Sequence, residues 1–183
     1  MAIGAIIGKK KLRFYKTMNK KVWIFIFIVS LFLAARLPAI NQIYHQDEYK
    51  WAMQADPAYD YASPHPPLGK SIFRITGDIL EFENLRLAPL LFSFLCLALI
   101  YVIIKKTTQK TRIAVFGALL FSINVYSVIA SLQIDIDGAI LPFFILLSYY
   151  AYLQLLTNNK KLWWVIFGIG IAGGFLTKLS FII

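Results

Sequence analysis

The chain has 183 residues, of which 59% are hydrophobic and 15% are charged, and its formal net charge is +10. This composition excludes an ordinary soluble domain and indicates an integral membrane protein. The positive charge does not indicate nucleic-acid binding, because thirteen of the nineteen Lys and Arg residues lie before the first apolar run or in two short segments between apolar runs, where they orient a protein in a membrane. The single cysteine, Cys96, lies in an apolar run, so an internal disulfide is excluded and a thiolate metal site is not indicated.

Five apolar segments are each long enough to cross a bilayer, which takes about 20 residues in a helix. We therefore predict an all-α integral membrane protein, a polytopic helical bundle with five transmembrane helices. Amphipathic juxtamembrane helices are predicted in the first outer loop. The predicted spans are Val22–Ile40, Leu87–Ile104, Ile113–Leu132, Gly138–Leu156 and Leu162–Ile183.

The segments between the spans alternate in charge. Residues 1–21, 105–112 and 160–161 carry only basic charges, which by the positive-inside rule predicts that they are cytoplasmic. All nine acidic residues fall instead in the loop 41–86 and in the turn before the fourth span. We therefore predict a multi-pass protein with a cytoplasmic N-terminus and an outward-facing carboxylate site, with the cell membrane as its expected location.

Both ends of the chain suggest how it is organised. Met18 comes two residues before Lys20-Lys21 and an apolar run, so it is an alternative start, and we predict that residues 1–21 form a basic cytoplasmic tail. At the other end, Phe181-Ile182-Ile183 lies inside the fifth predicted span without a flanking charge. We therefore expect residues 22–183 to be the N-terminal part of a larger membrane domain.

The loop 41–86 is predicted to fold against the outer surface. Residues Tyr49–Met53 follow two acids and precede Asp56, which indicates a short interfacial helix that Asp47 or a neighbouring polar residue could cap. Residues 60–67 contain three prolines and cannot be helical. Residues Leu68–Gly77 have apolar side chains at helical spacing and predict a second, amphipathic helix.

This arrangement resembles the membrane glycosyltransferases that use polyprenyl-phosphate sugars, namely the protein O-mannosyltransferases and their relatives that glycosylate lipid A. The string His65-Pro66-Pro67-Leu68-Gly69-Lys70, which follows the pair Asp47-Glu48, most resembles the O-mannosyltransferase branch. The resemblance covers residues 22–183 and implies the GT-C fold. Further points of resemblance are Arg36, Asp135, Asp137 and Gly174-Phe175-Leu176-Thr177-Lys178.

The resemblance implies transfer of a hexose, with mannose the first candidate, from a polyprenyl or dolichyl phosphate sugar. The acceptor would be a protein Ser/Thr hydroxyl or an envelope glycolipid, and the anomeric carbon would be inverted. Because phosphate is already a good leaving group, the reaction needs a carboxylate base and cations that stabilise the departing phosphate. Asp47 is the predicted base, because its position matches the family's catalytic acid, and Glu48 is the alternative. Helix capping is the competing explanation for this acid pair.

Several basic groups are candidates for binding the lipid phosphate or the sugar. His65, Lys70 and Arg74 lie in the outer loop, where attraction to lipid headgroups is the competing explanation for the two cations. Arg36 and Lys178 lie in apolar spans, where charges are rare and commonly functional, although snorkelling toward the interface explains them equally well. At 1.5 Å per residue, Lys178 lies about 24 Å along the fifth helix, which places it on the side of the acids.

The pair Asp135 and Asp137 stands directly before the fourth span. Two such carboxylates could bind a divalent cation in a turn, could orient the acceptor or sugar, or could cap the span. No cofactor is firmly indicated, and a divalent cation is one option. The resemblance does not imply metal dependence.

The expected partners are a polyprenyl-phosphate-linked sugar donor, a protein or glycolipid acceptor, and membrane lipids, but not nucleic acid. Two other classes stay open, a transporter or channel fragment whose outer carboxylates gather cations, and a noncatalytic membrane scaffold. The first four spans carry no acids at mid-membrane and no paired broken helices, which argues against transport. A scaffold would tolerate replacement of Asp47, His65 and Lys70. If the chain is a fragment, it could be inactive alone, because a closed site would need further helices.

Overall fold

The computed structural model describes residues 20, 22–56, 58 and 66–182. Every regular element among these residues is helical, which confirms the predicted all-α class. Three helical stretches are long and apolar enough to span a membrane, and two further apolar helices are shorter. The three long stretches are Val22–Ala39, Phe82–Thr108 and Ile136–Leu155, and the two shorter helices are Thr111–Ile123 and Lys161–Thr177.

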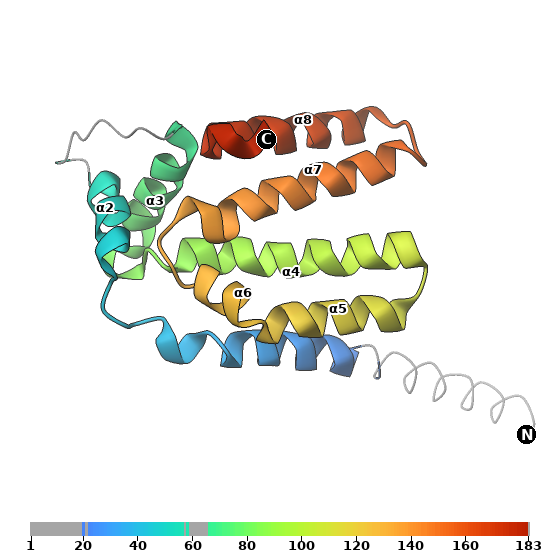
Figure 1. Ribbon diagram of the computed structural model, residues 1–183, viewed down its shortest axis with the longest axis horizontal. Coiled ribbons are helices and arrows are strands. Elements are labelled where there is room, and N and C mark those ends of the chain that lie inside the picture. Colours follow the sequence, from blue (N-terminus) through green and yellow to red (C-terminus); the bar gives the residue numbers. More distant parts are fainter. Residues whose placement is uncertain (1–19, 21, 57, 59–65, 183) are drawn as a thin grey trace, which may run out of the picture.

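The apolar helices lie side by side along their lengths (Figure 1). An N-terminal helix, residues 22–34, packs near α5 (Thr111–Ile123) and α4 (Leu87–Thr108). Beyond α4 lie α7 (Leu141–Leu155) and α8 (Lys161–Thr177). In chain order, the N-terminal helix, α4, α5, α7 and α8 run in alternating directions, so their connections alternate between the two ends of the bundle (Figure 1).

The described acidic residues all lie at one end of the bundle, and the connecting turns at the other end carry only basic charges. We call the end with α2 and α3 the acidic end, and the end with the α4–α5 and α7–α8 turns the basic end. This separation agrees with the alternation seen in the sequence. The described acids at the acidic end are Asp47, Glu48, Asp56, Asp78, Glu81, Glu83, Asp135 and Asp137, and the connecting turns of the basic end carry Lys105, Lys106, Lys110, Arg112, Lys160 and Lys161.

The third predicted span, Ile113–Leu132, is wrong as a continuous helix. α5 ends at Ile123, and a short helix, α6 (Val125–Ala130), starts directly after Asn124. The backbone of Asn124 is extended, with ψ of 125°, and its side chain accepts a hydrogen bond from the backbone N–H of Ser127 at 3.1 Å. Asparagine favours such caps because its side chain competes for backbone donors. The span therefore breaks near the acidic end.

The last two predicted spans also differ from the structure at the acidic end. The fourth begins earlier than Gly138, with a π-helical turn, η3 (Ile136–Ile140), that leads into α7. The fifth helix, α8, ends at Thr177 rather than continuing toward Ile183. Lys178 is extended, with φ of −153° and ψ of 131°, and a 3-10 turn, η4 (Leu179–Ile182), follows it.

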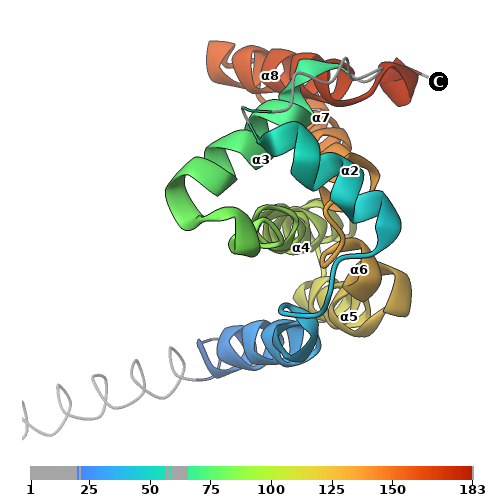
Figure 2. The ribbon, with the colours of Figure 1, turned by 90° about the vertical axis from the view of Figure 1, so that its left-hand side faces the viewer.

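The described residues of the loop 41–86 include two α-helices that lie across the acidic end (Figure 2). These are α2 (Gln46–Ala55) and α3 (Pro67–Leu80), which confirm the two predicted surface helices and are longer than predicted. α3 opens with a proline, which suits the first helical position because its missing N–H would have no helical partner there. Residues 59–65, most of the proline-rich segment, lie outside the described residues.

A buried apolar cluster fixes α2 and α3 to the bundle. The rings of Trp51 on α2 and Phe73 on α3 pack at a centroid distance of 6.0 Å. The same cluster includes residues of the segment before α7, so that segment is held directly beneath the two surface helices. Its buried members are Trp51, Ala52, Ala55, Phe73, Leu85, Ala88, Ile134, Ile136, Ile140 and Phe144.

Candidate functional site

A polar cleft of about 450 Å³ opens at the acidic end. One wall comes from α2 and the residue before it, and the other is the segment Gln133–Asp137 that leads into α7. The cleft therefore joins two acidic groups that are distant in the chain, Asp47 and the pair of aspartates. Its lining residues are His45, Asp47, Glu48, Lys50, Trp51, Gln133, Ile134, Asp135, Ile136 and Asp137.

The N-terminus of α2 is closed by a capping box in which His45 replaces the usual Ser or Thr. Glu48 Oε2 accepts a hydrogen bond from the backbone N–H of His45 at 2.7 Å, and His45 Nδ1 accepts one from the N–H of Asp47 at 3.4 Å. The cap is thus formed by His45 and Glu48. The side chain of Asp47 is not used for capping and stays available in the cleft.

The Asp47 carboxylate is open to solvent, with 74% of its side chain exposed. Lys50, one turn further along α2, donates a hydrogen bond to Asp47 Oδ1 at 3.1 Å. Its side chain is also exposed, and such surface pairs are weak and easily exchanged. The pair leaves Asp47 able to accept a proton from a group that enters the cleft.

The neighbouring Glu48 has the opposite environment. Only 5% of its side chain is exposed, and Arg86 donates to both carboxylate oxygens, from Nε to Oε1 at 3.0 Å and from NH2 to Oε2 at 2.8 Å. The backbone N–H of Ile134 also donates to Oε1 at 3.0 Å. Burial alone raises the pKa of Glu48, but the hydrogen bonds from Arg86, His45 and Ile134 outweigh it and hold the pKa below its ordinary value. Glu48 is therefore an ionised group that fixes one wall of the cleft.

Arg86 also connects Glu48 to the start of the outer loop. Its NH1 group donates to the backbone carbonyls of Gln42 at 2.6 Å and Ile40 at 3.2 Å. The ring of Tyr44 lies under the guanidinium, with 5.0 Å between the guanidinium carbon and the ring centroid. The planar guanidinium suits this role, because it can bind a carboxylate in two places while its other N–H groups reach carbonyls.

Asp135 and Asp137 have separate roles in the second wall. Asp135 Oδ1 accepts hydrogen bonds from the backbone N–H groups of Ile136 at 2.6 Å and Asp137 at 3.4 Å, so Asp135 caps η3. Asp137 Oδ2 pairs instead with Lys178 Nζ at 2.5 Å. Among the described residues, no group of three or more His, Cys, Asp or Glu side chains is placed to hold a metal ion.

Lys178 lies at the acidic end, as its distance along the fifth span predicts. Its side chain is 31% exposed and that of Asp137 is 44% exposed, so both remain accessible to a ligand. The ion pair connects the end of α8 to the cleft wall. A soluble or lipid-linked anion could compete with Asp137 for the ammonium group.

Arg36 is enclosed by protein and does not line the cleft. Its side chain is fully buried, and the guanidinium lies over the ring of Phe32 at 3.7 Å. It donates to the hydroxyls of Ser131 and Ser127, each at 2.8 Å, and to the carbonyl of Ser122 at 2.9 Å. Arg36 therefore does not extend its guanidinium toward the membrane interface. This geometry also does not support direct contact with a lipid phosphate. Arg36 attaches the N-terminal helix to the break between α5 and α6.

The candidates on α3 are not brought into the cleft. Lys70 is half-buried and Arg74 is exposed on α3, and neither is among the cleft-lining residues. His65 lies outside the described residues. Gly69 has a clear packing role, because a Cβ atom at this position would collide with the side chain of Ile136. The glycine in the string therefore lets α3 approach the second wall.

Sequence reasoning missed His45, Lys50 and Arg86. The three-residue spacing from His45 to Glu48 is that of a capping box, which could have indicated the histidine. Arg86 follows an acid-rich loop and directly precedes an apolar span. A charge at such a boundary needs a partner, and this could have indicated an ion pair with an acid of the loop. Lys50 carries no comparable signal.

Apolar helices with a charged cleft at one end define an integral membrane protein with a polar surface site. The chain belongs to the dolichyl-phosphate-mannose-protein mannosyltransferase family, whose sequence model matches residues 64–183. This confirms the resemblance drawn from the sequence and makes the protein, at the family level, a glycosyltransferase of the dolichyl-phosphate-mannose type. No curated protein and no solved structure matches the chain. The matched segment includes Asp137 and Lys178, whereas Asp47 and Glu48 precede it.

Proposed function

We propose that the protein transfers a hexose, with mannose the first candidate, from a polyprenyl-phosphate sugar to a hydroxyl group at the acidic end. The observation that carries this proposal is the cleft lined by the exposed carboxylate of Asp47 and by Asp137, whose carboxylate pairs with Lys178. The family supplies the reaction class, Asp47 supplies a base, and Lys178, bonded to the cleft wall, supplies a cation.

Asp47 acts as the general base in this proposal. The acceptor hydroxyl gives its proton to Asp47 as its oxygen forms a bond to the anomeric carbon of the sugar. The bond from that carbon to the phosphate oxygen breaks at the same time, and the electron pair leaves with polyprenyl phosphate. A direct displacement of this kind inverts the anomeric carbon. The exposure of Asp47 supports this role, whereas the buried, fully bonded Glu48 is suited to holding the cleft in shape.

Lys178 stabilises the departing phosphate. Its ammonium group is accessible and is held beside the cleft wall by its ion pair with Asp137. A phosphate group, which carries more negative charge than a carboxylate, can replace Asp137 as the partner of this ammonium group. Lys50 lines the cleft and supplies a second positive charge. His65, Lys70 and Arg74 remain proposed contacts to the donor, for which the family string and their place at or near α3 are the support. Asp135 contributes by shaping η3.

The acidic end faces away from the cytoplasm in this account. The basic turns at the opposite end support this orientation through the positive-inside rule. The isoprenoid chain of the donor stays among the apolar helices while its sugar reaches the surface cleft. The acceptor is a protein Ser/Thr hydroxyl or an envelope glycolipid.

A transfer assay tests the proposal. Membranes containing the protein, expressed from its complete reading frame, are incubated with radiolabelled polyprenyl-phosphate mannose and an endogenous extract, with vector-only membranes as the control. Label in protein supports a protein acceptor, and label in lipid supports a glycolipid acceptor. Failure of transfer from mannose, glucose and aminoarabinose donors alike would contradict the proposal and favour a transporter or a noncatalytic scaffold.

A further inference from the structure

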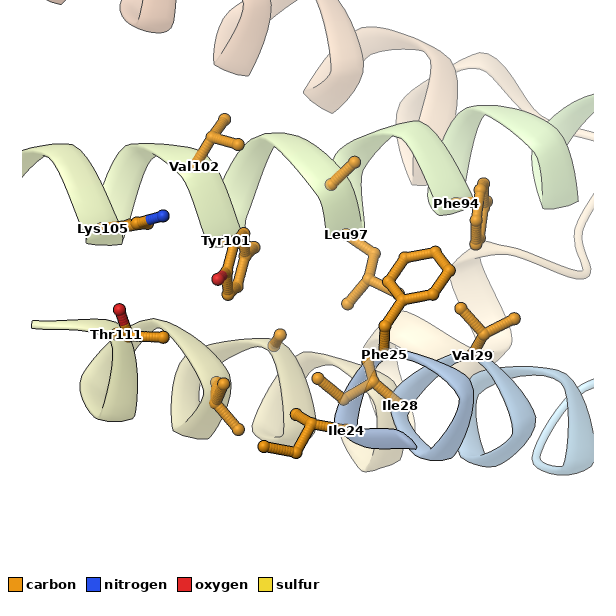
Figure 3. Close-up of a pocket in the computed structure, with 13 residues that line it drawn as sticks. Ile24, Phe25, Ile28, Val29, Phe94, Leu97, Tyr101, Val102, Lys105 and Thr111 are labelled. Carbon is orange, nitrogen blue, oxygen red and sulfur yellow. The ribbon is translucent and has the colours of Figure 1, made fainter. Parts of the chain in front are cut away.

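A second concave surface lies along the bundle, away from the acidic cleft. It is an apolar groove of about 310 Å³ between the N-terminal helix, α4 and α5 (Figure 3). Most of its lining is aliphatic or aromatic, with Phe25 and Ile28 from the N-terminal helix and Leu97 from α4. A groove of this kind suits one hydrocarbon chain lying along the helix axes.

The groove has a basic end. Lys105 of α4 and Thr111 of α5 lie at one end of the groove in Figure 3, whereas Phe94 and Val29 lie toward the other. Lys105 is exposed, and within the described part of the chain it forms no ion pair with an acid. Its ammonium group lies 6.0 Å from the ring centroid of Tyr101, which also lines the groove. A positive charge at the end of an apolar channel favours an amphiphile with an anionic head.

The neighbouring Lys106 shows that this placement is specific to Lys105. Lys106 Nζ donates to the side chains of Gln154 and Thr157, each at 2.8 Å, and so is bonded to the end of α7. Thr111 adds a hydroxyl near Lys105 that can donate to a phosphate oxygen. All nine acids of the sequence lie in other segments, so they do not neutralise this end.

We infer that the groove binds an anionic glycerophospholipid of the leaflet at the basic end. One acyl chain lies between the N-terminal helix and α4, and the phosphate lies at Lys105 and Thr111. Basic pockets between membrane helices commonly bind anionic head groups in this way.

This lipid is distinct from the sugar donor. Lys105 lies about 27 Å along α4 from Leu87, at 1.5 Å per residue, whereas the donor phosphate reacts at the acidic end. One lipid cannot place its phosphate at both ends. The inference therefore does not depend on the proposed transfer reaction.

Photo-crosslinking tests the inference. The protein, expressed from its complete reading frame, is reconstituted in phosphatidylcholine vesicles with a trace of phosphatidylglycerol or phosphatidylcholine that carries a diazirine in one acyl chain. We expect phosphatidylglycerol to label groove peptides of the N-terminal helix and α4 more strongly than phosphatidylcholine. Lys105→Ala should lower this preference about fivefold, which corresponds to about 1 kcal/mol.

Two variants complete the test. Lys161→Ala removes the same charge from the same end of the bundle, on α8, and should leave the lipid preference unchanged. Ala98→Phe fills the groove and should lower labelling by both lipids while Lys105 is kept, because Ala98 lines the groove and is exposed. Equal labelling by the two lipids, equal effects of Lys105→Ala and Lys161→Ala, or unchanged labelling of the groove in Ala98→Phe would each overturn the inference.

Discussion

Glu48 and Arg86 form a buried ion pair that joins the two ends of the outer loop to one wall of the cleft. Arg86 donates hydrogen bonds to both carboxylate oxygens of Glu48, and Glu48 also accepts a hydrogen bond from the backbone N–H of Ile134. The adjacent Asp47 remains exposed on the same helix. The pair Asp47-Glu48 thus contains one exposed carboxylate, which is the proposed base, and one buried carboxylate that holds the fold together.

Replacing Glu48 by Gln should strongly destabilise the protein. The substitution leaves the Arg86 guanidinium buried without its counter-charge, and breaking such a pair lowers the free energy of unfolding by about 3–5 kcal/mol. Thermal unfolding in detergent measures the effect. Glu83→Gln is the matched control, because Glu83 is an exposed acid of the same loop. Equal melting temperatures for the two variants would contradict the role assigned to Glu48.

The contribution of Glu48 to stability should depend on pH. Because folding lowers the pKa of Glu48 from its ordinary value of 4.5, the carboxylate stabilises the folded state fully above that value. The stabilisation is lost as the pH falls through the lower, folded-state pKa. The difference in melting temperature between wild type and Glu48→Gln should therefore be constant near neutral pH and shrink in acid below 4.5. A difference that does not change with pH would contradict this assignment.

Lys178→Met should slow sugar transfer far more than it weakens the fold. Its ion pair with Asp137 is partly exposed, so the loss of stability should be below about 1 kcal/mol. Loss of a charge-assisted hydrogen bond to the departing phosphate should lower kcat/KM for the donor about tenfold. Steady-state transfer rates at varied donor concentration measure this. Lys161→Met serves as the control, and an unchanged kcat/KM in Lys178→Met would exclude Lys178 from the proposed phosphate site.

Gly69→Ala should destabilise the contact between α3 and the cleft wall. The added methyl group meets the side chain of Ile136, and overpacking of this kind lowers the free energy of unfolding by about 1–3 kcal/mol. Combining it with Ile136→Ala should cost less than the sum of the two single changes, because the collision is removed. Gly168→Ala is a control in open space. Strict additivity would show that Gly69 and Ile136 do not interact.

Hydropathy and charge predicted most of the helix pattern. The apolar runs, the basic turns and the two amphipathic stretches of the outer loop each depend on local sequence, and so α2, α3 and α4 were found from it. The break at Asn124 was missed because an asparagine between apolar residues is also tolerated inside a buried helix. The end of α8 at Thr177 was missed because the apolar residues continue beyond Lys178.

The candidate site was only partly predictable. Sequence placed Asp47 and Asp137 on the same side of the membrane, but the distance between them along the chain hid the shared cleft. The different roles of Asp47 and Glu48 depend on Arg86, a partner that only the folded loop brings close. Arg36 shows the converse, since its suspicious position in an apolar span reflects bonds to serines around the α5–α6 break.

The most direct test of the account compares sugar transfer by wild type, Asp47→Asn and Asp78→Asn under single-turnover conditions, with protein levels matched in membranes. Asp78 is an exposed acid on α3 and controls for loss of one negative charge at the acidic end. We expect Asp47→Asn to lower the rate by about 10²–10⁴-fold, the range expected for a general base, and Asp78→Asn to stay near wild type. Transfer by Asp47→Asn at close to the wild-type rate would contradict the assignment of Asp47 as the base.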